Sequence, residues 1–460
     1  MPSYTCADSL PDIFPDYSNA TIPGNIAPLN FRINDKITKH IVRFVAGRDS
    51  FELSCREDVA IPVKKWKKIL QNNLGTQLTI RIFAQQSTGW IKYRDVSLQI
   101  APDPIDPYIV YRLINPGYEY WSKMGIYQRD IESFSESPVL INSVVDGACM
   151  NCHSFCGNNP EKMLFHIRAQ HAGTILKNND QIVKLDTKIA GQISAAVYPR
   201  WHPEGRYIAF STNQTAQAFH AKNDNLIEVY DSASDLIIYD TETESMYTHP
   251  MIHAADKFET FPEWSPDGKT LYFCSASAAT MPESYDSLRY DLLSVTFDAQ
   301  TGKFGNRVDT VLQSSKMGKS TAFPRVSPDG KYMLVCLSNF GTFPIWHQEN
   351  DLYLLDMQTG NFIPMDNVNS EESDSYHSWS SNGRWIVFGS RRIDGLYTRL
   401  YLAYFDRQGQ FHHPFLLPQK NPAFYNYSLK SYNIPEFITN KIKTPPRTFE
   451  RVAKDKAKKL

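Results

Sequence analysis

The sequence predicts an all-β protein, in which an N-terminal β-sandwich is followed by a β-propeller of six blades, with a short, partly helical connector between them. Two observations carry this prediction. A turn-and-strand segment recurs in the second half of the chain, and short alternating segments fill residues 25–101. Recurrence of one supersecondary unit is typical of folds in which each unit buries its apolar face against its neighbours. The regions we expect are an extension at 1–24, the sandwich at 25–101, the connector at 102–162, the propeller at 163–440 and a basic tail at 441–460.

The expected sandwich consists of short segments with period-two alternation, such as LNFRI, HIVRFVAG and QLTIRIFA, separated by turn-forming residues. This spacing is typical of β-sandwiches. One stretch differs, because PVKKWKKILQNN (62–73) carries Val63, Trp66, Ile69 and Leu70 at helical spacing. We therefore expect one short helix there, with a single apolar face.

The connector begins in the proline-rich stretch APDPIDPY (101–108), because repeated prolines suit neither a central strand nor a helix interior. Within it, GYEYWSKMGIYQRDIESF (117–134) is expected to contain a helix. At the other end of the chain, TPPRTFERVAKDKAKKL is basic and follows a Pro-Pro break, and we expect a solvated or frayed terminus.

The repeat pairs a tight turn with an apolar alternating strand. In the turn, a proline or serine leads to aspartate or asparagine, and a glycine then adopts positive φ at low steric cost. Each copy is followed by a second strand pair ending in an Asp-containing turn, as in the outer half of a four-stranded blade. The four copies are YPRWHPEGRYIAFSTN (198–213), FPEWSPDGKTLYFCSAS (261–277), FPRVSPDGKYMLVCLSN (323–339) and YHSWSSNGRWIVFGSRR (376–392).

An unpaired outer segment, QIVKLDTKI (181–189), precedes the first full copy. The propeller is therefore expected to begin inside a blade at about residue 160, and the C-terminal segment 412–440 is expected to complete that blade. Such closure removes exposed sheet edges.

The connector also contains Cys149-Met150-Asn151-Cys152-His153, and C-x-x-C-H is the spacing at which haem c is attached. The two thiols would bind the porphyrin covalently, and His153 would be the proximal ligand of the haem iron. For the distal position we favour His166, with Met163 and His171 as alternatives. The motif thus predicts a covalent haem c.

Two other interpretations of these cysteines remain open. Cys149, Cys152 and Cys156 could bind zinc together with His166 or His171, or two of the three thiols could form a structural disulfide. By contrast, Cys274 and Cys336 occupy matching places in two repeats and are expected to be small buried core residues.

The repeat residues W-S-P-D-G-K, followed by an apolar strand, resemble the PD40 or WD40-like repeat of TolB-type β-propellers. More narrowly, the order of NIAPLNFRI (25–33), DPIDPYIVYRLINPGYEYW (103–121), CMNCHSF (149–155) and the propeller resembles a group of Bacteroidetes TolB-like proteins, often labelled cytochrome c-like. This resemblance implies an exported envelope protein, commonly a lipoprotein, and implies no specific reaction.

Composition narrows the partners. A formal charge of −1 over 460 residues gives no electrostatic footprint for nucleic acid. No apolar run approaches the roughly 18 residues that would span a bilayer, and the N-terminus lacks the pattern of a signal peptide. Cys6 is a weak candidate for a lipid anchor, since its flanking residues depart from a lipoprotein cleavage site.

Two functional hypotheses follow from these patterns. The first is electron transfer or redox sensing by haem c in the periplasm or at the outer membrane, with the propeller as a docking platform for an envelope or redox protein. The alternative is a non-catalytic propeller that binds a ligand or another protein, with structural cysteines or a zinc site. G-x-S-x-G, H-E-x-x-H and P-loop motifs do not occur, so hydrolase and nucleotide-binding functions lack their local sequence patterns.

Overall fold

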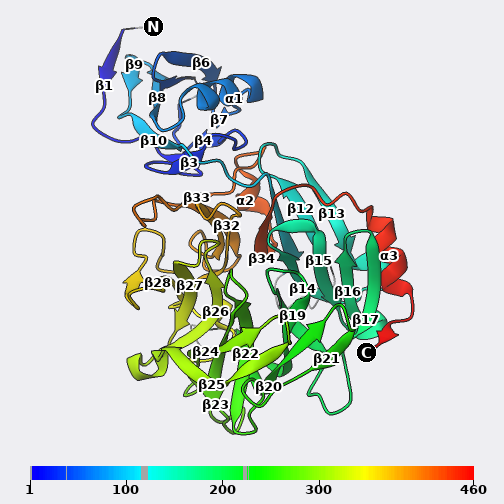
Figure 1. Cartoon of the computed structure of the whole chain (residues 1–460). Coiled ribbons are helices and arrows are strands. Elements are labelled where there is room, and N and C mark those ends of the chain that lie inside the picture. Colours follow the sequence, from blue (N-terminus) through cyan, green and yellow to red (C-terminus); the bar gives the residue numbers. More distant parts are fainter. Residues whose placement is uncertain (1–2, 38, 116–122, 221–224, 226) are drawn as a thin grey trace.

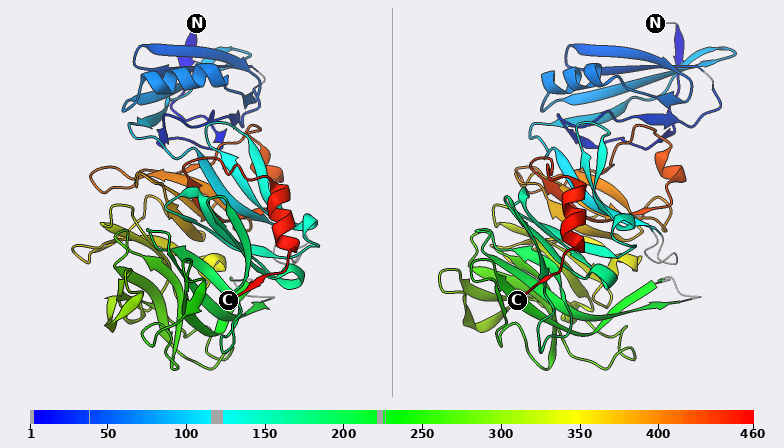
Figure 2. Two further views of the ribbon diagram at one scale, coloured as in Figure 1. Left: turned by 45° about the vertical axis from the view of Figure 1, so that its right-hand side comes forward. Right: turned by 90° about the vertical axis from the view of Figure 1, so that its right-hand side faces the viewer.

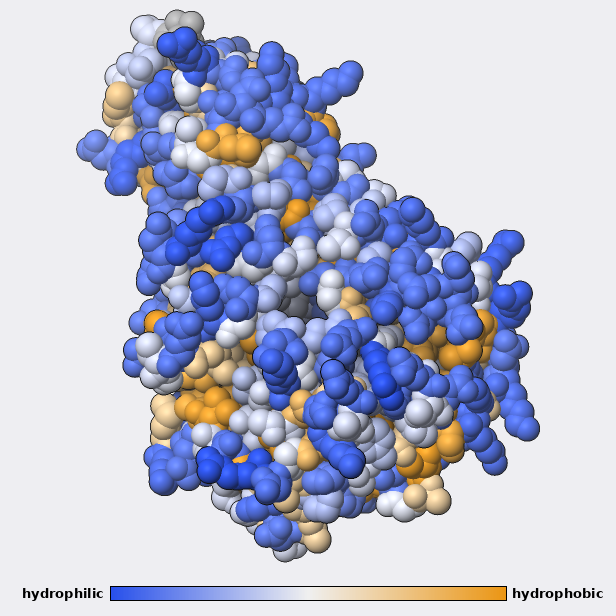
Figure 3. All heavy atoms as spheres, in the orientation of Figure 1, coloured by the Kyte–Doolittle hydropathy of each residue, from blue (hydrophilic) through white to orange (hydrophobic). Residues whose placement is uncertain are grey.

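The structure, a computed structural model, describes the whole chain except residues 1–2, 38, 116–122, 221–224 and 226. It is dominated by β-strands, and a small N-terminal unit packs against one side of a larger ring of sheets (Figures 1 and 2). The face seen in Figure 3 is mostly hydrophilic, with small separate hydrophobic groups. The predicted all-β class is confirmed.

The N-terminal unit consists of a seven-stranded sheet, a three-stranded sheet and one helix. The larger sheet contains β1 (Tyr4–Cys6), β3 (Thr21–Pro23), β5 (His40–Ala46), β6 (Asp49–Cys55), β8 (Gln77–Gln86), β9 (Gly89–Lys92) and β10 (Val96–Ala101). The smaller contains β2 (Ile13–Phe14), β4 (Phe31–Ile33) and β7 (Asp58–Val59), and the helix is α1 (Val63–Asn72).

Helix α1 confirms the expected helix and covers part of the larger sheet. Its Trp66, Ile69 and Leu70 are buried in the same core as Phe44 of β5, and the Trp66 Nε1 donates to the carbonyl of Ile26 at 3.0 Å. The seven-stranded sheet is thus paired with a helix and a small sheet, and not with a second sheet of similar size. The segment 1–24 is no separate extension, because β1 pairs with β9 and β3 pairs with β10.

The ring consists of six sheets within the described residues, each with four strands or more. The first sheet contains β34 (Ser431–Ile438), β11 (Tyr108–Ile114), β12 (Met124–Asp130) and β13 (Glu136–Ile141). The second contains β14 (Met150–Cys156), β15 (Asn159–Ile167), β16 (Gly173–Asn178), β17 (Gln181–Asp186) and β35 (Lys458–Lys459). The third contains β18 (Ala196–Trp201), β19 (Tyr207–Phe219), β20 (Ile227–Asp240) and β21 (Ser245–Tyr247).

The fourth sheet contains β22 (Lys257–Trp264), β23 (Thr270–Ser277), β24 (Asp291–Asp298) and β25 (Lys303–Leu312). The fifth contains β26 (Ser320–Val326), β27 (Tyr332–Ser338), β28 (Asp351–Asp356) and β29 (Phe362–Pro364). The sixth contains β30 (Asp374–Trp379), β31 (Trp385–Ser390), β32 (Arg399–Tyr404) and β33 (Phe415–Leu416). Helices α2 (Phe424–Tyr427) and α3 (Pro446–Lys454) follow. Short 3-10 helices span Asn142–Val144, Ala169–His171, Ser314–Met317 and Pro344–Trp346.

The innermost strands of the six sheets contact one another in a closed cycle. In chain order β14 contacts β18, then β22, β26 and β30 follow, and β34 contacts both β30 and β14. Antiparallel sheets arranged radially around one axis form a β-propeller. The chain closes this ring with its C-terminal strand β34, which pairs with β11.

The recurrent turn has the structure that its sequence predicts. In the copy at Ser265–Lys269, the Ser265 hydroxyl donates to Asp267 at 2.6 Å, and Asp267 accepts from the Lys269 backbone N–H at 3.1 Å. Gly268 has φ 70° and its N–H donates to the carbonyl of Ser265. The turn therefore depends on a short acceptor followed by a residue that tolerates positive φ.

The connector prediction is wrong, because most of this segment is a propeller sheet. Strands β11, β12 and β13 form the outer three strands of the sheet that β34 completes, and where a helix was expected at 117–134 the described residues contain strand β12 followed by a turn. Residues 117–122 of that helix lie outside the described residues. The segment 412–440 does complete a blade, yet its partner is the strand at 108–114 and not the sheet near residue 160.

The C-terminal tail is also ordered, contrary to the expected frayed terminus. Helix α3 buries Phe449, Val452 and Ala453, and Phe449 contacts Phe165 edge to face at 5.5 Å between ring centroids. The two residues of β35 then pair with β17. The three apolar residues on one face of α3 thus pack the basic C-terminal segment against the propeller, and Figure 1 shows the helix lying along the outside of the ring.

The N-terminal unit and the propeller share one apolar core cluster, and polar contacts near the proline-rich stretch also join them. Asp106 accepts from the Ser381 backbone N–H and from its hydroxyl, both at 2.6 Å, and Asp103 accepts from Tyr404 at 2.6 Å. Over the described part of the chain, no helix has the length and apolarity needed to cross a bilayer.

Candidate functional site

Each innermost strand has a β-bulge at the same place, and the six bulges together close the propeller axis. At every bulge one residue has positive φ, and the register to the neighbouring strand shifts. A bulge leaves an extra residue unpaired and redirects side chains. The six positive-φ residues are Cys152 (52°), Tyr198 (48°), Phe261 (49°), Phe323 (52°), Tyr376 (44°) and Ile434 (48°).

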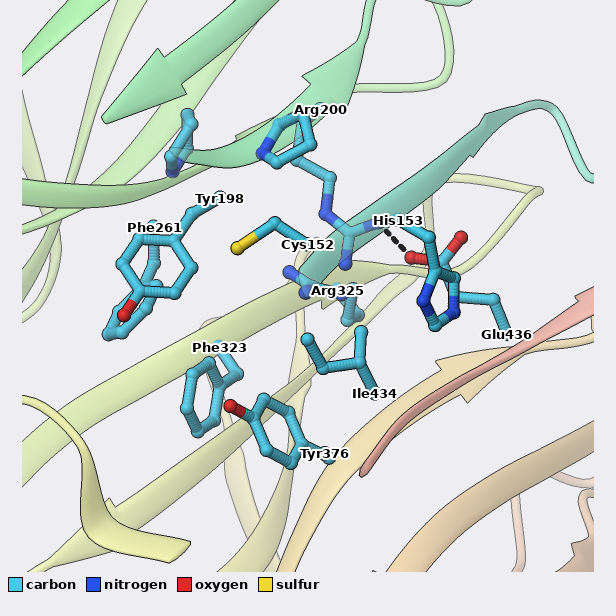
Figure 4. A pocket seen from close by; sticks show the side chains of 12 residues that line it. Cys152, His153, Tyr198, Arg200, Phe261, Phe323, Arg325, Tyr376, Ile434 and Glu436 are labelled. Atoms are coloured by element: carbon cyan, nitrogen blue, oxygen red, sulfur yellow. Dashed lines mark hydrogen bonds and ion pairs between the residues drawn. The ribbon is translucent and has the colours of Figure 1, made fainter. Parts of the chain in front are cut away.

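These six residues, which we call the bulge ring, pack around the axis as a mainly aromatic plug. Neighbouring rings are in contact, with centroid distances of 4.7 Å for Tyr198 and Phe261 and 4.5 Å for Phe261 and Phe323. The residual cavity beside the ring has a volume of about 20 Å³, which is room for roughly one water molecule. Figure 4 shows these side chains converging on that small space.

The residue after each bulge residue is proline in four blades and histidine in two. His153 and His377 are these histidines, and both are buried. Burial lowers the pKa of each imidazole to about 4, so both are neutral near pH 7. Within the described part of the chain, neither nitrogen of His153 has a hydrogen-bond partner.

One residue further along, charged side chains from four blades form a network inside the channel. Arg200 pairs with Glu263 at 3.1 Å and with Glu436 at 2.9 Å, and Arg325 pairs with Glu263 at 3.4 Å. Their side chains are at most 15% exposed. Burial raises the pKa of Glu263, and the positive charge of Arg200 acts in the opposite direction.

The C-x-x-C-H sequence therefore coincides with the repeat. Cys152-His153-Ser154-Phe155 occupies the bulge position that Tyr376-His377-Ser378-Trp379 occupies in another blade. This copy and the copy at Ile434-Pro435-Glu436-Phe437 lack the turn and the aromatic first residue of the four copies that the sequence made recognisable. The shared signal was a bulge residue, then Pro or His, then a polar residue, then in five of the six copies an aromatic residue, with Val326 as the exception.

The arrangement of these residues does not fit a covalent haem c. Cys149 lines a cavity on one side of the bulge ring, whereas His153 lines the 20 Å³ space on its other side, and Cys152 lies between the two spaces and lines both. In Figure 4 the Cys152 thiol and the His153 imidazole point in different directions. Haem attachment needs the imidazole beneath the same porphyrin that the thiols hold, and a space of one water molecule cannot contain that ring.

The favoured distal ligand His166 lies within a sheet, on β15 next to β14. Its Nδ1 is 3.0 Å from the Thr174 hydroxyl, and burial lowers its pKa to about 3. Of the alternatives, Met163 is a fully buried core residue, and the His171 Nε2 pairs with Asp146 at 2.7 Å. None of the three lines the cavity beside Cys149 and Cys152.

The zinc ligand set is likewise separated. The Cys156 thiol faces the carbonyl of His202 at 3.6 Å and packs in a different core cluster from Cys149. Among the described residues, no three histidine, cysteine, aspartate or glutamate side chains form a group that could bind a metal. All seven cysteines are free thiols, and Cys274 and Cys336 are fully buried, as the repeat predicts.

We expect the protein to carry no haem when it is produced in a bacterium with a c-type maturation system. The reason is the opposite placement of thiol and imidazole about the bulge ring. Intact-mass spectrometry should return the mass of the polypeptide alone, with a c-type cytochrome made in the same cells as the control. A Soret band that survives denaturation and disappears in Cys149→Ser with Cys152→Ser would contradict this expectation.

The larger cavity, which we call the funnel, has a volume of about 380 Å³ and opens on the other side of the bulge ring. Four bulge residues, Cys152, Tyr198, Tyr376 and Ile434, line both spaces and separate them. The other main lining side chains are Arg112, Met124, Cys149, Asn151, Arg168, Thr215, Ala216, Gln217, Phe343, Trp346 and Asn433. Part of the wall is the β19–β20 hairpin, which extends beyond the ring in the right-hand view of Figure 2.

The comparisons with known proteins do not identify a family. No family model and no curated protein matches the chain. Solved structures that are similar include a DUF4784 family protein from Bacteroides caccae, with 8% identity, a TM-score of 0.34 and coverage of 80% of this chain and 98% of that one.

Prolyl oligopeptidase B from Galerina marginata has 9% identity and a TM-score of 0.37, and an ancestral GH74 enzyme has 11% identity and a TM-score of 0.36. The matches cover 80% and 91% of this chain, respectively, but only 50% and 47% of those proteins. At these TM-scores the similarities carry no argument, so the assignment to the β-propellers depends on the sheet topology.

Proposed function

We propose that this protein is a non-catalytic, ligand-binding β-propeller, and that a small molecule binds in the funnel. The observation that carries the proposal is the combination of a cavity of about 380 Å³ with the closed bulge ring beneath it. Small-molecule sites are concave, are largely apolar, and have a volume of about 300–1,000 Å³ with a few polar groups. The funnel has a volume in this range, and its wall combines aromatic and aliphatic side chains with a comparable share of polar ones.

The bulge ring makes the funnel a dead end. A ligand therefore enters and leaves on one face and rests on the aromatic side chains of Tyr198 and Tyr376. Two buried polar atoms of residues that line the funnel also support ligand binding. The Asn151 Oδ1 and the Arg112 Nε have no hydrogen-bond partner within the described residues. An unsatisfied buried polar group costs about 1–3 kcal/mol, and a ligand that pairs with it removes that cost.

The test is a thermal-shift screen of a panel of small metabolites on the wild type and on Ala216→Trp. Ala216 lines the funnel, so the indole of the variant should fill it and abolish ligand-induced stabilisation. At about one hundred times Kd, a ligand stabilises the folded state by about 2.7 kcal/mol. Gln214→Trp is the matched control, because Gln214 is exposed on the same strand and does not line the funnel.

The proposal is supported if compounds raise the melting temperature of the wild type and of Gln214→Trp but not that of Ala216→Trp. It fails if no compound in the panel shifts the wild type, or if the shifts in Ala216→Trp are unchanged. The unliganded melting temperatures of the three proteins show whether each variant folds. The haem hypothesis is tested separately, by the intact mass of the protein. The location in the cell envelope stays a prediction.

A further inference from the structure

We infer that the funnel ligand is a small aromatic carboxylate that also carries a hydrogen-bond donor. The inference rests on the proposed function and deepens it by naming the class of ligand. Three independent features of the funnel support it: the sign of its charge, one unpaired buried acceptor, and an aromatic wall.

The charge of the funnel is positive. Of the described residues that line it, Arg112 and Arg168 are charged and none is acidic. Arg168 is exposed at the mouth and has no ion-pair partner among the described side chains. The nearby acid Asp231 does not line the funnel. It accepts from Thr215 at 2.6 Å and from Asn213 at 2.7 Å, and burial raises its pKa although the nearby charge of Arg168 acts in the opposite direction.

Arg112 is held in place by neighbours that leave its charge unneutralised. Its guanidinium donates to the carbonyl of Met150 at 3.3 Å and to the Asn433 Oδ1 at 3.1 Å, and both acceptors are uncharged. A cation that is braced by neutral acceptors keeps its attraction for an anion. A carboxylate in the funnel would therefore meet the guanidinium of Arg112, which its neighbours hold in place, and the exposed side chain of Arg168.

The unpaired acceptor belongs to Asn151, which lines the funnel one residue before the bulge. Its side chain is 8% exposed, and its Oδ1 has no hydrogen-bond partner in the described part of the chain. An amide oxygen accepts and cannot donate. A ligand that satisfies it must supply an N–H or O–H group in addition to the carboxylate.

The aromatic wall is formed by Trp346, Phe343, Tyr198 and Tyr376. Phe343 packs against Tyr376 with ring centroids 5.9 Å apart and against Tyr198 at 6.3 Å. Arg391 lies over the Trp346 ring at 4.1 Å, which fixes the indole from outside. Rigid aromatic surfaces favour a planar apolar body that stacks on them.

The experiment is isothermal titration calorimetry with two matched probes. Indole-3-acetate has an aromatic body, a carboxylate and an N–H donor, and indole-3-ethanol differs by replacing the carboxylate with a neutral alcohol. Because a hydrogen bond to a charged group contributes roughly 1.5–3 kcal/mol, we expect the acid to bind at least about tenfold more tightly. Added salt should weaken the binding of the acid and leave the binding of the alcohol unchanged.

Arg168→Gln should weaken the binding of the acid by about tenfold or more and leave the affinity for the alcohol unchanged. Arg168 is the better target, since Arg112 also braces β14 and β34. Arg307→Gln is the control, because Arg307 is 79% exposed and lies away from the funnel. Equal binding of both probes, or no effect of Arg168→Gln, overturns the inference, and so does the absence of binding by the acid.

These outcomes are separable from failure of the proposed function. If Ala216→Trp blocks the alcohol as well as the acid, the funnel is a binding site whatever the charge of its ligand. If the indole probes do not bind but metabolites of another class stabilise the wild type and not Ala216→Trp, the function stands and the ligand class is wrong.

Discussion

Truncation after Lys430 is expected to abolish cooperative folding of the propeller. The deletion removes β34, the innermost strand that joins the last sheet to the first. It leaves the ladder groups of β11 unpaired on that side and removes the fully buried side chains of Tyr432, Phe437 and Ile438. Losing three large core side chains costs on the order of 10 kcal/mol, which is comparable with the whole stability of a domain.

The measurement is urea unfolding followed by circular dichroism. Truncation after Asp455 is the control, because it removes only the exposed residues of β35 and the last few side chains. The control should unfold cooperatively, with a midpoint close to that of the full chain. A chain ending at Lys430 that unfolds with the same midpoint and slope would show that the ring does not depend on its C-terminal closure.

Arg200→Met is expected to destabilise the protein by about 3–5 kcal/mol, because it breaks a buried charge network from one side. The Arg200 guanidinium forms one ion pair with Glu263 and another with Glu436. The substitution keeps much of the side-chain volume and leaves two carboxylates with fewer partners inside the channel. Chemical denaturation of the variant and the wild type at pH 7 gives the difference directly.

Two further variants separate loss of charge pairing from loss of packing. Adding Glu436→Gln to Arg200→Met should recover part of the lost stability, since the amide has a smaller desolvation cost than an unpaired carboxylate. Lys454→Ala removes an exposed pair to Glu450, with 43% and 32% exposed side chains, and should cost less than about 1 kcal/mol. Equal losses for Arg200→Met and Lys454→Ala would contradict a buried network.

Four of the six sheets could be predicted from the repeat in the sequence. Turn chemistry is local, so the Ser-Pro-Asp-Gly segments and the alternating strands after them are legible without tertiary information. The helix at 62–73 was predictable for the same reason, because Trp66, Ile69 and Leu70 form its apolar face. These features depend on residues within a few positions of one another.

The other two sheets were harder to find, because their inner strands replace the common aromatic bulge residue. Cys152 and Ile434 take that position, and the ring-closing sheet combines β34 with strands more than three hundred residues earlier. Such a pairing has no local sequence signature. The segment with strands β11–β13 consequently resembled a connector, and the spacing of Cys149, Cys152 and His153 resembled a haem attachment site.

The sequence by itself determined the all-β class and the repeated turn-and-strand unit, because each follows from local geometry or from period-two patterning. Only the tertiary structure decided which way the axial side chains face. The bulge at Cys152 puts His153 in the small axial space and Cys149 in the funnel, and ring closure brings Arg112, Asn151, Arg168 and Trp346 around one cavity. Strand register and long-range closure set these directions, and neither is encoded in the spacing of a short motif.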